Sequence, residues 1–116
     1  MAVRRIVANI AAQDISLARA FYGEIFDLDL VMDHGWIATY GAAAQMSVQI
    51  SVATEGGSGT PVPDISIEVD DLAAVFERVM RKDIAIVYGP VDEPWGVRRF
   101  FVRDPFGKLI NVLSHI

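Results

Sequence analysis

The side chains that could do chemistry in this sequence are of few kinds. The chain has no cysteine and two histidines, His34 in an Asp-His-Gly turn signal and His115 beside the last residue. Thiolate nucleophiles, disulfides and cysteine metal sites are therefore excluded. We interpret both histidines as solvated side chains. What remains is a set of carboxylates and aromatic rings, which suits a planar, amphipathic or cationic ligand held by stacking and cation–π contacts.

The two tryptophans of the chain are Trp36 and Trp95. Trp36 shares the parity of Tyr40 along a predicted strand, so both rings should point to one side of it. Trp95 lies in a predicted loop, 89–96, that could reach over the mouth of a cleft. The alternative for Trp36 and Tyr40 is that they fill a core or a dimer interface.

Two adjacent arginines, Arg98 and Arg99, begin a later predicted strand that also contains Phe101. Alternation places Phe101 on the side of Arg99. Either arginine could pair with an anionic ligand or with an acidic residue across the sheet, and the sequence leaves both choices open.

Composition limits the classes of protein that this chain could be. It has 116 residues, of which 53% are hydrophobic and 22% charged, as expected for one folded domain. The high apolar content indicates a second buried surface, such as a dimer interface. A net charge of -5 argues against a nucleic-acid partner. We expect neither a signal peptide nor a membrane span, and the absence of cysteine suits the cytoplasm.

The first half of the chain reads as a strand, a helix and three strands. We predict strands over 5–12, 27–32, 36–40 and 46–52, the last with the clearest alternation in the chain. Asp14 is placed to cap the helix, whose apolar side chains Leu17, Phe21 and Ile25 recur at helical spacing. Residues 1–53 form module one, and the Gly- and Pro-rich stretch 54–63 is a predicted linker.

The second half, module two over 64–116, repeats this order. We predict strands over 64–69, 84–88, 98–103 and 109–114, and a helix capped by Asp70 or Asp71 whose apolar side chains are Leu72, Val75, Phe76, Val79 and Met80. The segments NIAAQDISLA and SIEVDDLAAV, beginning at residues 9 and 66, align over the strand-to-helix junction. The sequence thus predicts an α+β domain built from two βαβββ modules, unless chance made two capped strand–helix units alike.

Two motifs connect this pattern to a known family. DISLARAFY begins at Asp14, and RDPFGKLI begins at Arg103, where Asp-Pro and Gly favour a tight turn before the last strand. In this paired frame the chain resembles the vicinal-oxygen-chelate superfamily, the glyoxalase, bleomycin-resistance and dioxygenase group. It departs from the family pattern at Asp27, usually Gly, and at Lys108, often Asn. The resemblance implies an incompletely closed eight-stranded barrel around a cavity, and a homodimer, swapped or unswapped.

The resemblance also shows where metal ligands would lie. The family's ligand positions fall on Val7, Gln49, Asp64 and Asn111, which offer one carboxylate and two amides. This set is poor for divalent transition metals and weak for Ca²⁺. We therefore predict no metal and no other cofactor. Glyoxalase and dioxygenase chemistry needs a metal, so the resemblance favours the bleomycin-resistance type, which binds a small molecule without reaction.

We accordingly predict a metal-independent binding or sequestering protein with no catalytic residue, whose partners are a small molecule and a second copy, not a membrane. Strand parity and the resemblance place these residues in its cleft: Asn9, Trp36, Tyr40, Gln49, Asp64, Ser66, Glu68, Trp95, Phe101 and Asn111. The alternative is a metal-independent lyase or isomerase in which Asp64 or Glu68 acts as a base. Both carboxylates could equally be solvated residues at the rim.

Overall fold

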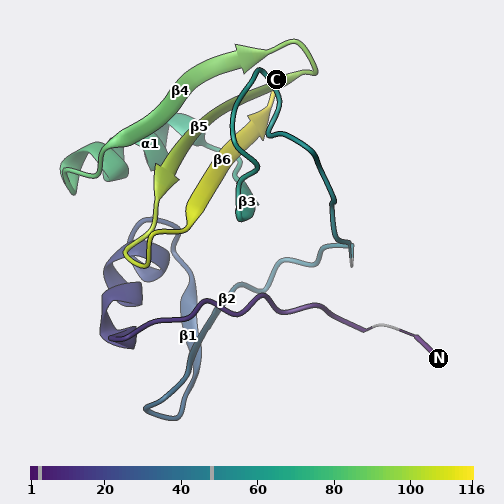
Figure 1. Ribbon diagram of the computed structural model, residues 1–116. Coiled ribbons are helices and arrows are strands. Elements are labelled where there is room, and N and C mark those ends of the chain that lie inside the picture. Colours follow the sequence, from purple (N-terminus) through teal and green to yellow (C-terminus); the bar gives the residue numbers. More distant parts are fainter. Residues whose placement is uncertain (3, 48) are drawn as a thin grey trace. The chain divides into compact units, whose positions relative to one another are not determined.

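The computed structural model describes residues 1–2, 4–47 and 49–116, in which the chain forms two compact units (Figure 1). The first unit is Met1–Ala53 and the second is Thr54–Ile116. The segment 54–63, predicted as a linker, thus belongs to the second unit.

The helical part of the first unit is irregular. A 3₁₀ helix (η1, Ile15–Leu17) begins after Asp14, whose carboxylate accepts a hydrogen bond from Ser16 N at 3.0 Å. A π-helical turn (η2, Arg19–Gly23) follows and buries Phe21 and Tyr22. The predicted helix is therefore present as two short segments, of which η1 is wound more tightly than an α-helix and η2 more widely. The chain leaves it through Asp27, which has φ +56°, a conformation that Asp tolerates better than most residues.

The two strands of the first unit form an antiparallel hairpin. β1 (Asp29–Asp33) pairs with β2 (Ala38–Gly41). The turn between them is supported by a hydrogen bond from Gly35 N to Asp33 Oδ1 at 2.8 Å. The prediction placed Trp36 inside a strand, but β2 begins two residues later, so Trp36 lies in the turn.

Two predicted strands of the first unit are absent from the described part of the chain. Residues 5–12 form no strand, nor do residues 46–47 and 49–52, and Val48 lies outside the described residues. An alternating pattern becomes a strand only when an edge is present to pair with. In this single copy their apolar side chains stay exposed, for example Ile6, Met46 and Ile50. The described residues therefore form six strands in two sheets, where the prediction had eight in a barrel.

The second unit is a complete βαβββ module. Its strands are β3 (Ile65–Glu68), β4 (Ile86–Glu93), β5 (Val97–Arg103) and β6 (Leu109–His115), with α1 (Leu72–Arg81) between β3 and β4. The order across the sheet is β3-β6-β5-β4, with β3 parallel to β6 and the other pairs antiparallel. This mixed sheet confirms the α+β class and the order of elements predicted for the second half.

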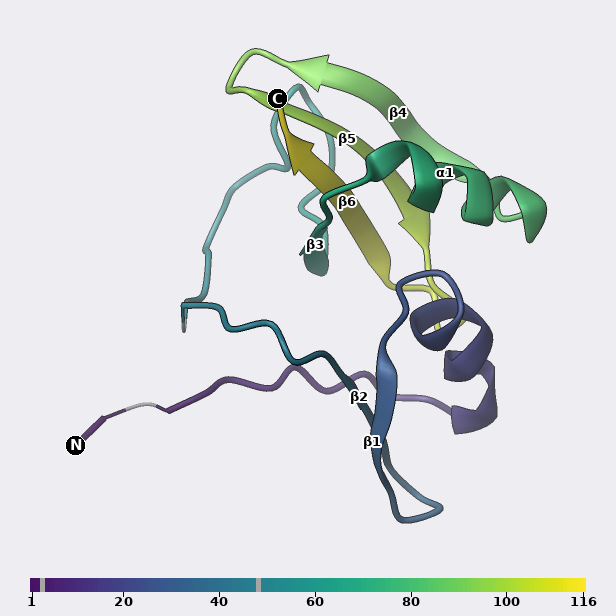
Figure 2. The same cartoon turned by 180° about the vertical axis from the view of Figure 1, so that it is seen from behind.

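Helix α1 covers one side of this sheet (Figure 2). Asp71 caps it by accepting a hydrogen bond from Ala74 N at 3.0 Å, which satisfies one of the free N–H groups of the first turn. Its buried side chains are Leu72, Val75 and Val79, as predicted, whereas Met80 is exposed.

The core of the second unit lies between α1 and the central strands. Phe76 of α1 meets Phe100 edge to face, with ring centroids 5.4 Å apart. Phe100 pairs across the sheet with Val112, and both are fully buried. Because neighbouring side chains alternate, Phe101 and its partner Asn111 point to the other side of the sheet, away from α1.

Strand β4 is longer than predicted and forms an edge of the sheet. It continues through Gly89–Glu93, which we predicted as loop, and leaves a short turn closed by a hydrogen bond from Gly96 N to Glu93 O. Its register against β5 shifts between Ile86 and Tyr88, and again between Tyr88 and Val91, where Gly89 and Pro90 lie. Gly89 has φ +77°, and a Cβ there would lie 2.5 Å from Arg99 O, so only glycine fits. This irregularity hid the strand from the sequence pattern.

Candidate functional site

The face of the second unit's sheet opposite α1 carries most of the polar side chains that the sequence singled out. Ser66 and Glu68 come from β3, Asn111 from β6 and Phe101 from β5. The register pairs Ser66 with Asn111 and Asn111 with Phe101, which brings these three side by side across the sheet. We call this surface the open face.

The centre of the open face holds a buried amide. Asn111 is 8% exposed and donates a hydrogen bond from Nδ2 to Ser66 Oγ at 3.1 Å. Its carbonyl oxygen, Oδ1, is buried and accepts no hydrogen bond from the described residues. A buried acceptor without a partner costs about 1–3 kcal/mol. A ligand donor that bonds to this oxygen would remove that cost.

The two carboxylates of the open face are both engaged. Asp64 Oδ2 accepts a hydrogen bond from Leu109 N at 2.7 Å, and Asp64 N donates to Leu109 O, so this residue joins the starts of β3 and β6. Glu68 Oε2 lies 3.3 Å from His115 Nδ1, with both side chains well exposed. Asp64 thus serves the sheet, and Glu68 forms a solvated pair at its rim.

A buried ion pair lies at one end of the open face. Arg99 is 3% and Glu93 is 6% exposed, and Arg99 Nε donates to Glu93 Oε2 at 2.7 Å. The carboxylate also accepts from Ser58 Oγ at 3.0 Å and from the Tyr88 hydroxyl at 3.2 Å. Arg99 donates further to the carbonyls of Gly56 and Gly57, at 2.8 and 3.3 Å. Nearly every donor and acceptor of the pair is used, as a buried pair requires.

Three aromatic rings surround the same guanidinium. The Arg99 Cζ atom lies 5.4 Å from the ring centroid of Tyr88, 5.0 Å from that of Trp95 and 4.8 Å from that of Phe101. These rings are the kind of cage that the sequence suggested for a cationic ligand. In the structure the protein's own cation fills it.

The sequence left open which of the two arginines lies on this side of the sheet. In the structure it is Arg99, which pairs with Glu93. Arg98 points to the other side and pairs with Asp92, with Nε 2.6 Å from Oδ1. The hydrogen bond from Arg98 lowers the pKa of Asp92 below its ordinary value, and the same contact raises the pKa of Arg98. Sequence reasoning missed Glu93, Tyr88 and Ser58. For Glu93 a sequence signal was present: the acidic pair 92–93 and the basic pair 98–99 lie on either side of a Pro-Trp-Gly turn, as expected for two ion pairs across a hairpin.

The other predicted cleft residues are distributed between the two units. Asn9 and Gln49 are exposed and outside any strand, Trp36 is 79% exposed in the hairpin turn, and Tyr40 is half-buried in β2. All four belong to the first unit. In the second unit Trp95 is 51% exposed and lies in the tight β4–β5 turn, where the prediction had a longer loop.

The fold and this face define a class of protein. The second unit has the order βαβββ with a mixed sheet. In the Asp-Pro-Phe-Gly turn before β6, buried Asp104 accepts hydrogen bonds from Phe106 N and Lys108 N at 2.9 and 2.8 Å. The first unit contributes a helical segment followed by a hairpin. The described residues thus form an α+β fold with few helices and a mixed sheet.

The family follows from comparison with known sequences. The profile described as "Glyoxalase/Bleomycin resistance protein/Dioxygenase superfamily" matches residues 4–112, nearly the whole chain, so the chain belongs to this superfamily. No curated protein matches the chain.

Solved structures with the same fold include three bacterial proteins. TnmS3, an antibiotic binding protein from Streptomyces sp. CB03234, is 22% identical with a TM-score of 0.72, covering 100% of this chain and 99% of that one. A superfamily member from Sphaerobacter thermophilus DSM 20745 is 20% identical with a TM-score of 0.71, covering 98% of each chain. TioX from Micromonospora sp. ML1 is 20% identical with a TM-score of 0.64, covering 97% and 96%.

The residues at the family's metal positions do not fit a metal ion. Val7 has no ligand atom, the Asn111 amide donates to Ser66, and Asp64 accepts from the backbone of Leu109. Among residues 1–2, 4–47 and 49–116, no three His, Asp or Glu side chains gather where they could hold a metal. We therefore derive no metal-dependent step. In the same part of the chain, no helix is long and apolar enough to cross a bilayer.

Proposed function

We propose that this chain is a metal-independent small-molecule binding protein of the bleomycin-resistance type. It holds a flat organic ligand against the open face. Membership of the superfamily supports this proposal, as does the fold it shares with TnmS3, which is described as an antibiotic binding protein. The donor set at the metal positions, which suits no metal, turns the proposal toward binding without reaction.

The observation that carries the proposal is the Asn111 amide. Its Oδ1 atom is buried and accepts no hydrogen bond from the described residues; Asn111 pairs with Phe101 on β5, contacts Ser66 on β3 and follows Leu109 by two residues on β6. A ligand that presents an N–H or O–H group to Oδ1, and apolar surface to the rest, satisfies both parts of this surface. The contacts predicted for Trp36 and Tyr40 of the first unit stay predictions.

Quenching of intrinsic fluorescence by a panel of glycopeptide, polyketide and aromatic-acid compounds tests this function. For the best ligand, Asn111→Ala should weaken binding about tenfold, since about 1.4 kcal/mol is lost with one hydrogen bond. Trp36→Phe and Trp95→Phe, titrated separately, test the stacking role of each indole. Arg98→Ala, on the opposite side of the sheet, is the matched control and should bind as the parent does. Unchanged affinity in Asn111→Ala contradicts the proposal.

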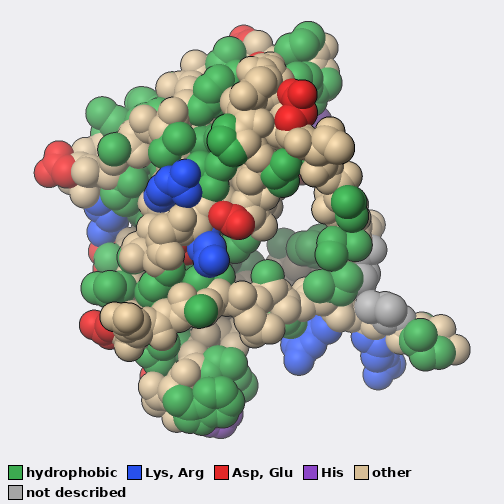
Figure 3. Space-filling model, in the orientation of Figure 1, with side chains coloured by type: hydrophobic (Ala, Val, Ile, Leu, Met, Phe, Trp, Pro, Cys, Tyr) green, Lys and Arg blue, Asp and Glu red, His purple; other side chains and the backbone are tan. Residues whose placement is uncertain are grey.

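We also propose that the protein is a homodimer. The first unit leaves large apolar side chains exposed, and Figure 3 shows hydrophobic side chains gathered at the tip of the β1–β2 hairpin, where Met32 and Trp36 lie. The unpaired segments 5–12 and 49–52 would gain the strand edges they lack from a second copy. Light scattering at micromolar concentrations should report twice the mass of the chain, and a monomer contradicts this proposal.

A further inference from the structure

The segment 55–60, which we call the strap, is held closed by its own hydrogen bonds despite three glycines in six residues. Gly56 N donates to Thr60 O at 2.8 Å, and Thr60 N donates to Gly57 O at 3.0 Å. Thr60 Oγ1 reaches the same carbonyl at 2.7 Å, and Gly59 N donates to Glu55 Oε1 at 3.2 Å. The stretch predicted as a linker thus forms a compact loop held by its own hydrogen bonds.

The strap is fastened to the sheet by the buried ion pair. Arg99 donates to the carbonyls of Gly56 and Gly57, while Ser58 Oγ donates to Glu93 Oε1. Figures 1 and 2 show the strap and α1 on opposite sides of the sheet, so the strap lies on the open face. Because both of its residues bond to this one loop, we call the Arg99–Glu93 pair the latch.

The contact between the strap and Trp95 admits only glycine. Gly57 has φ +86°, and a Cβ there would lie 2.7 Å from Trp95 Cη2 and 3.4 Å from Arg99 Nη2. The loop backbone therefore rests directly on the indole edge. Any side chain at this position must displace either the strap or the ring.

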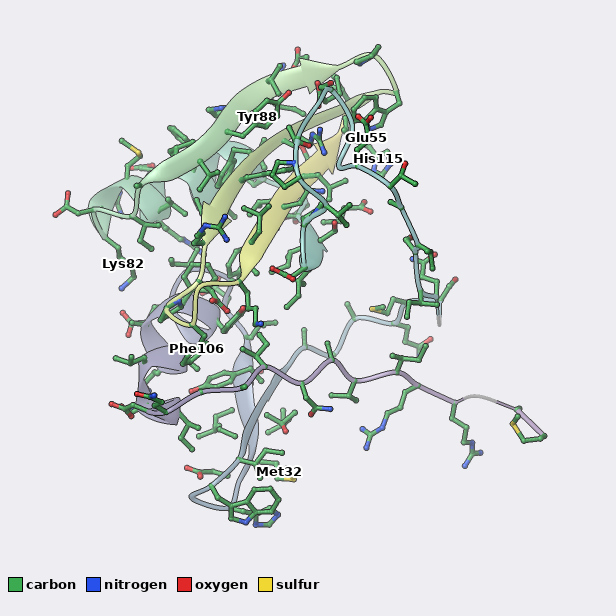
Figure 4. The ribbon with its side chains drawn as sticks, in the orientation of Figure 1. Met32, Glu55, Lys82, Tyr88, Phe106 and His115 are labelled. Atoms are coloured by element: carbon green, nitrogen blue, oxygen red, sulfur yellow. The ribbon has the colours of Figure 1, made fainter. Side chains whose placement is uncertain are left out.

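The strap makes its contacts at one end of the open face, and further along this face the side chain of Ser66 is exposed. Along β5 the residues of this face are Val97, Arg99, Phe101 and Arg103, and the strap contacts are made at Arg99. Figure 4 shows Tyr88 and Glu55 toward this end of the sheet. Ser66 and Asn111, opposite Phe101, lie beyond the strap contacts. A ligand seated on Asn111 would meet the strap if it extended toward Trp95.

We propose that the strap is a specificity element that limits the length of the ligand, and that the Arg99–Glu93 pair is its latch. This inference rests on the proposed function, namely binding at the open face. The site then takes flat ligands of about the length between Asn111 and the strap and rejects longer ones. Release of the strap uncovers Tyr88 and the inner face of Trp95, which gives a longer flat molecule further aromatic surface to stack on.

The test uses a Trp36→Phe background, in which Trp95 is the sole tryptophan and reports on the strap. Two variants should release the strap in different ways. Gly57→Ala places a Cβ against the Trp95 ring. The double variant Arg99→Met/Glu93→Gln removes the latch without leaving a buried charge unpaired. Gly107→Ala is the matched control, because Gly107 has φ +82° but open space around its Cβ position. Near-ultraviolet circular dichroism and thermal unfolding verify that each variant is folded.

Two measurements are made on each variant. Acrylamide quenching of Trp95 reports whether the strap has moved. Titration with a short neutral probe, N-phenylnaphthylamine, and a longer one, Nile red, reports which length of ligand the face accepts. We expect both released variants to show stronger quenching and about tenfold tighter Nile red binding, with N-phenylnaphthylamine binding little changed. Gly107→Ala should match the background in both measurements.

The outcomes separate the two proposals. Stronger quenching without a change in the ratio of the two probe affinities overturns the strap as a specificity element. Unchanged quenching in both released variants overturns the latch. Asn111→Ala, made in the same background, tests the face itself. If it leaves N-phenylnaphthylamine binding unchanged, the proposed function fails and the strap proposal with it, whereas a loss of binding there keeps the function whatever the strap variants do.

Discussion

Replacing Arg99 alone should destabilise the protein severely. In Arg99→Met, the carboxylate of Glu93, whose side chain is 3% exposed, loses its only charged partner among the described residues and keeps only the hydroxyls of Tyr88 and Ser58. Breaking a buried ion pair from one side costs about 3–5 kcal/mol. A domain of this size has a total stability of about 5–15 kcal/mol, so the loss is a large part of it.

The second substitution should restore much of that loss. Adding Glu93→Gln removes the stranded charge while keeping an acceptor for the two hydroxyls, and we expect at least about 2 kcal/mol to return. Urea unfolding followed by circular dichroism measures the single and the double variant in one cycle. Arg98→Met is the control: its ion pair with Asp92 is half-exposed, so this variant should be much more stable than Arg99→Met. If Arg99→Met is as stable as Arg98→Met, or the double variant no better than the single, the reasoning is refuted.

Three further predictions concern the turn before β6, acid stability and the hairpin tip. Asp104→Ala removes two backbone hydrogen bonds to a buried carboxylate and should lose about 3 kcal/mol in urea unfolding; a loss below 1 kcal/mol, on the same scale, contradicts this. The hydrogen bond from Arg98 lowers the pKa of Asp92, so the contribution of this carboxylate to folding stability is present above about pH 4 and is lost as the pH falls. Asp92→Asn should therefore flatten the decline of stability between about pH 5 and pH 2. Trp36→Ala removes apolar surface from the hairpin tip and should weaken the proposed dimer at least about tenfold in a dilution series followed by light scattering; an unchanged dimer dissociation constant contradicts this.

The second unit was largely predictable because its local signals agree with its tertiary pairing. Asp71 precedes a helix with one apolar face, and the apolar residues around Val102 and Val112 pair with each other in the sheet. Strand parity and the family resemblance together placed Ser66, Phe101 and Asn111 in one cleft, and the register aligns these three residues across the sheet. Such positions follow from a period of two once a strand is known to exist.

The first unit was less predictable for a physical reason. Residues 46–52 have the clearest alternation in the chain, yet the described ones form no strand, because alternation fixes which side a residue faces and not whether a partner edge is present. The hydrogen-bonded network around Arg99 and Glu93 was also not predicted from the sequence. Glu93 and Arg99 meet only because β4 continues past Gly89 to a tight turn, which sets the register of the two residues.

Strand β4 bears on how this protein avoids association through its sheet. It is an outermost strand, and an exposed edge offers free N–H and C=O groups on which foreign chains can add and aggregate. Pro90 supplies no N–H, and the register breaks beside it bend the row of donors and acceptors out of line. Open-ended growth of the sheet is therefore blocked on this side. At the opposite edge, β3 offers only four residues, so the four-stranded sheet of the second unit presents little template for fibril-like stacking.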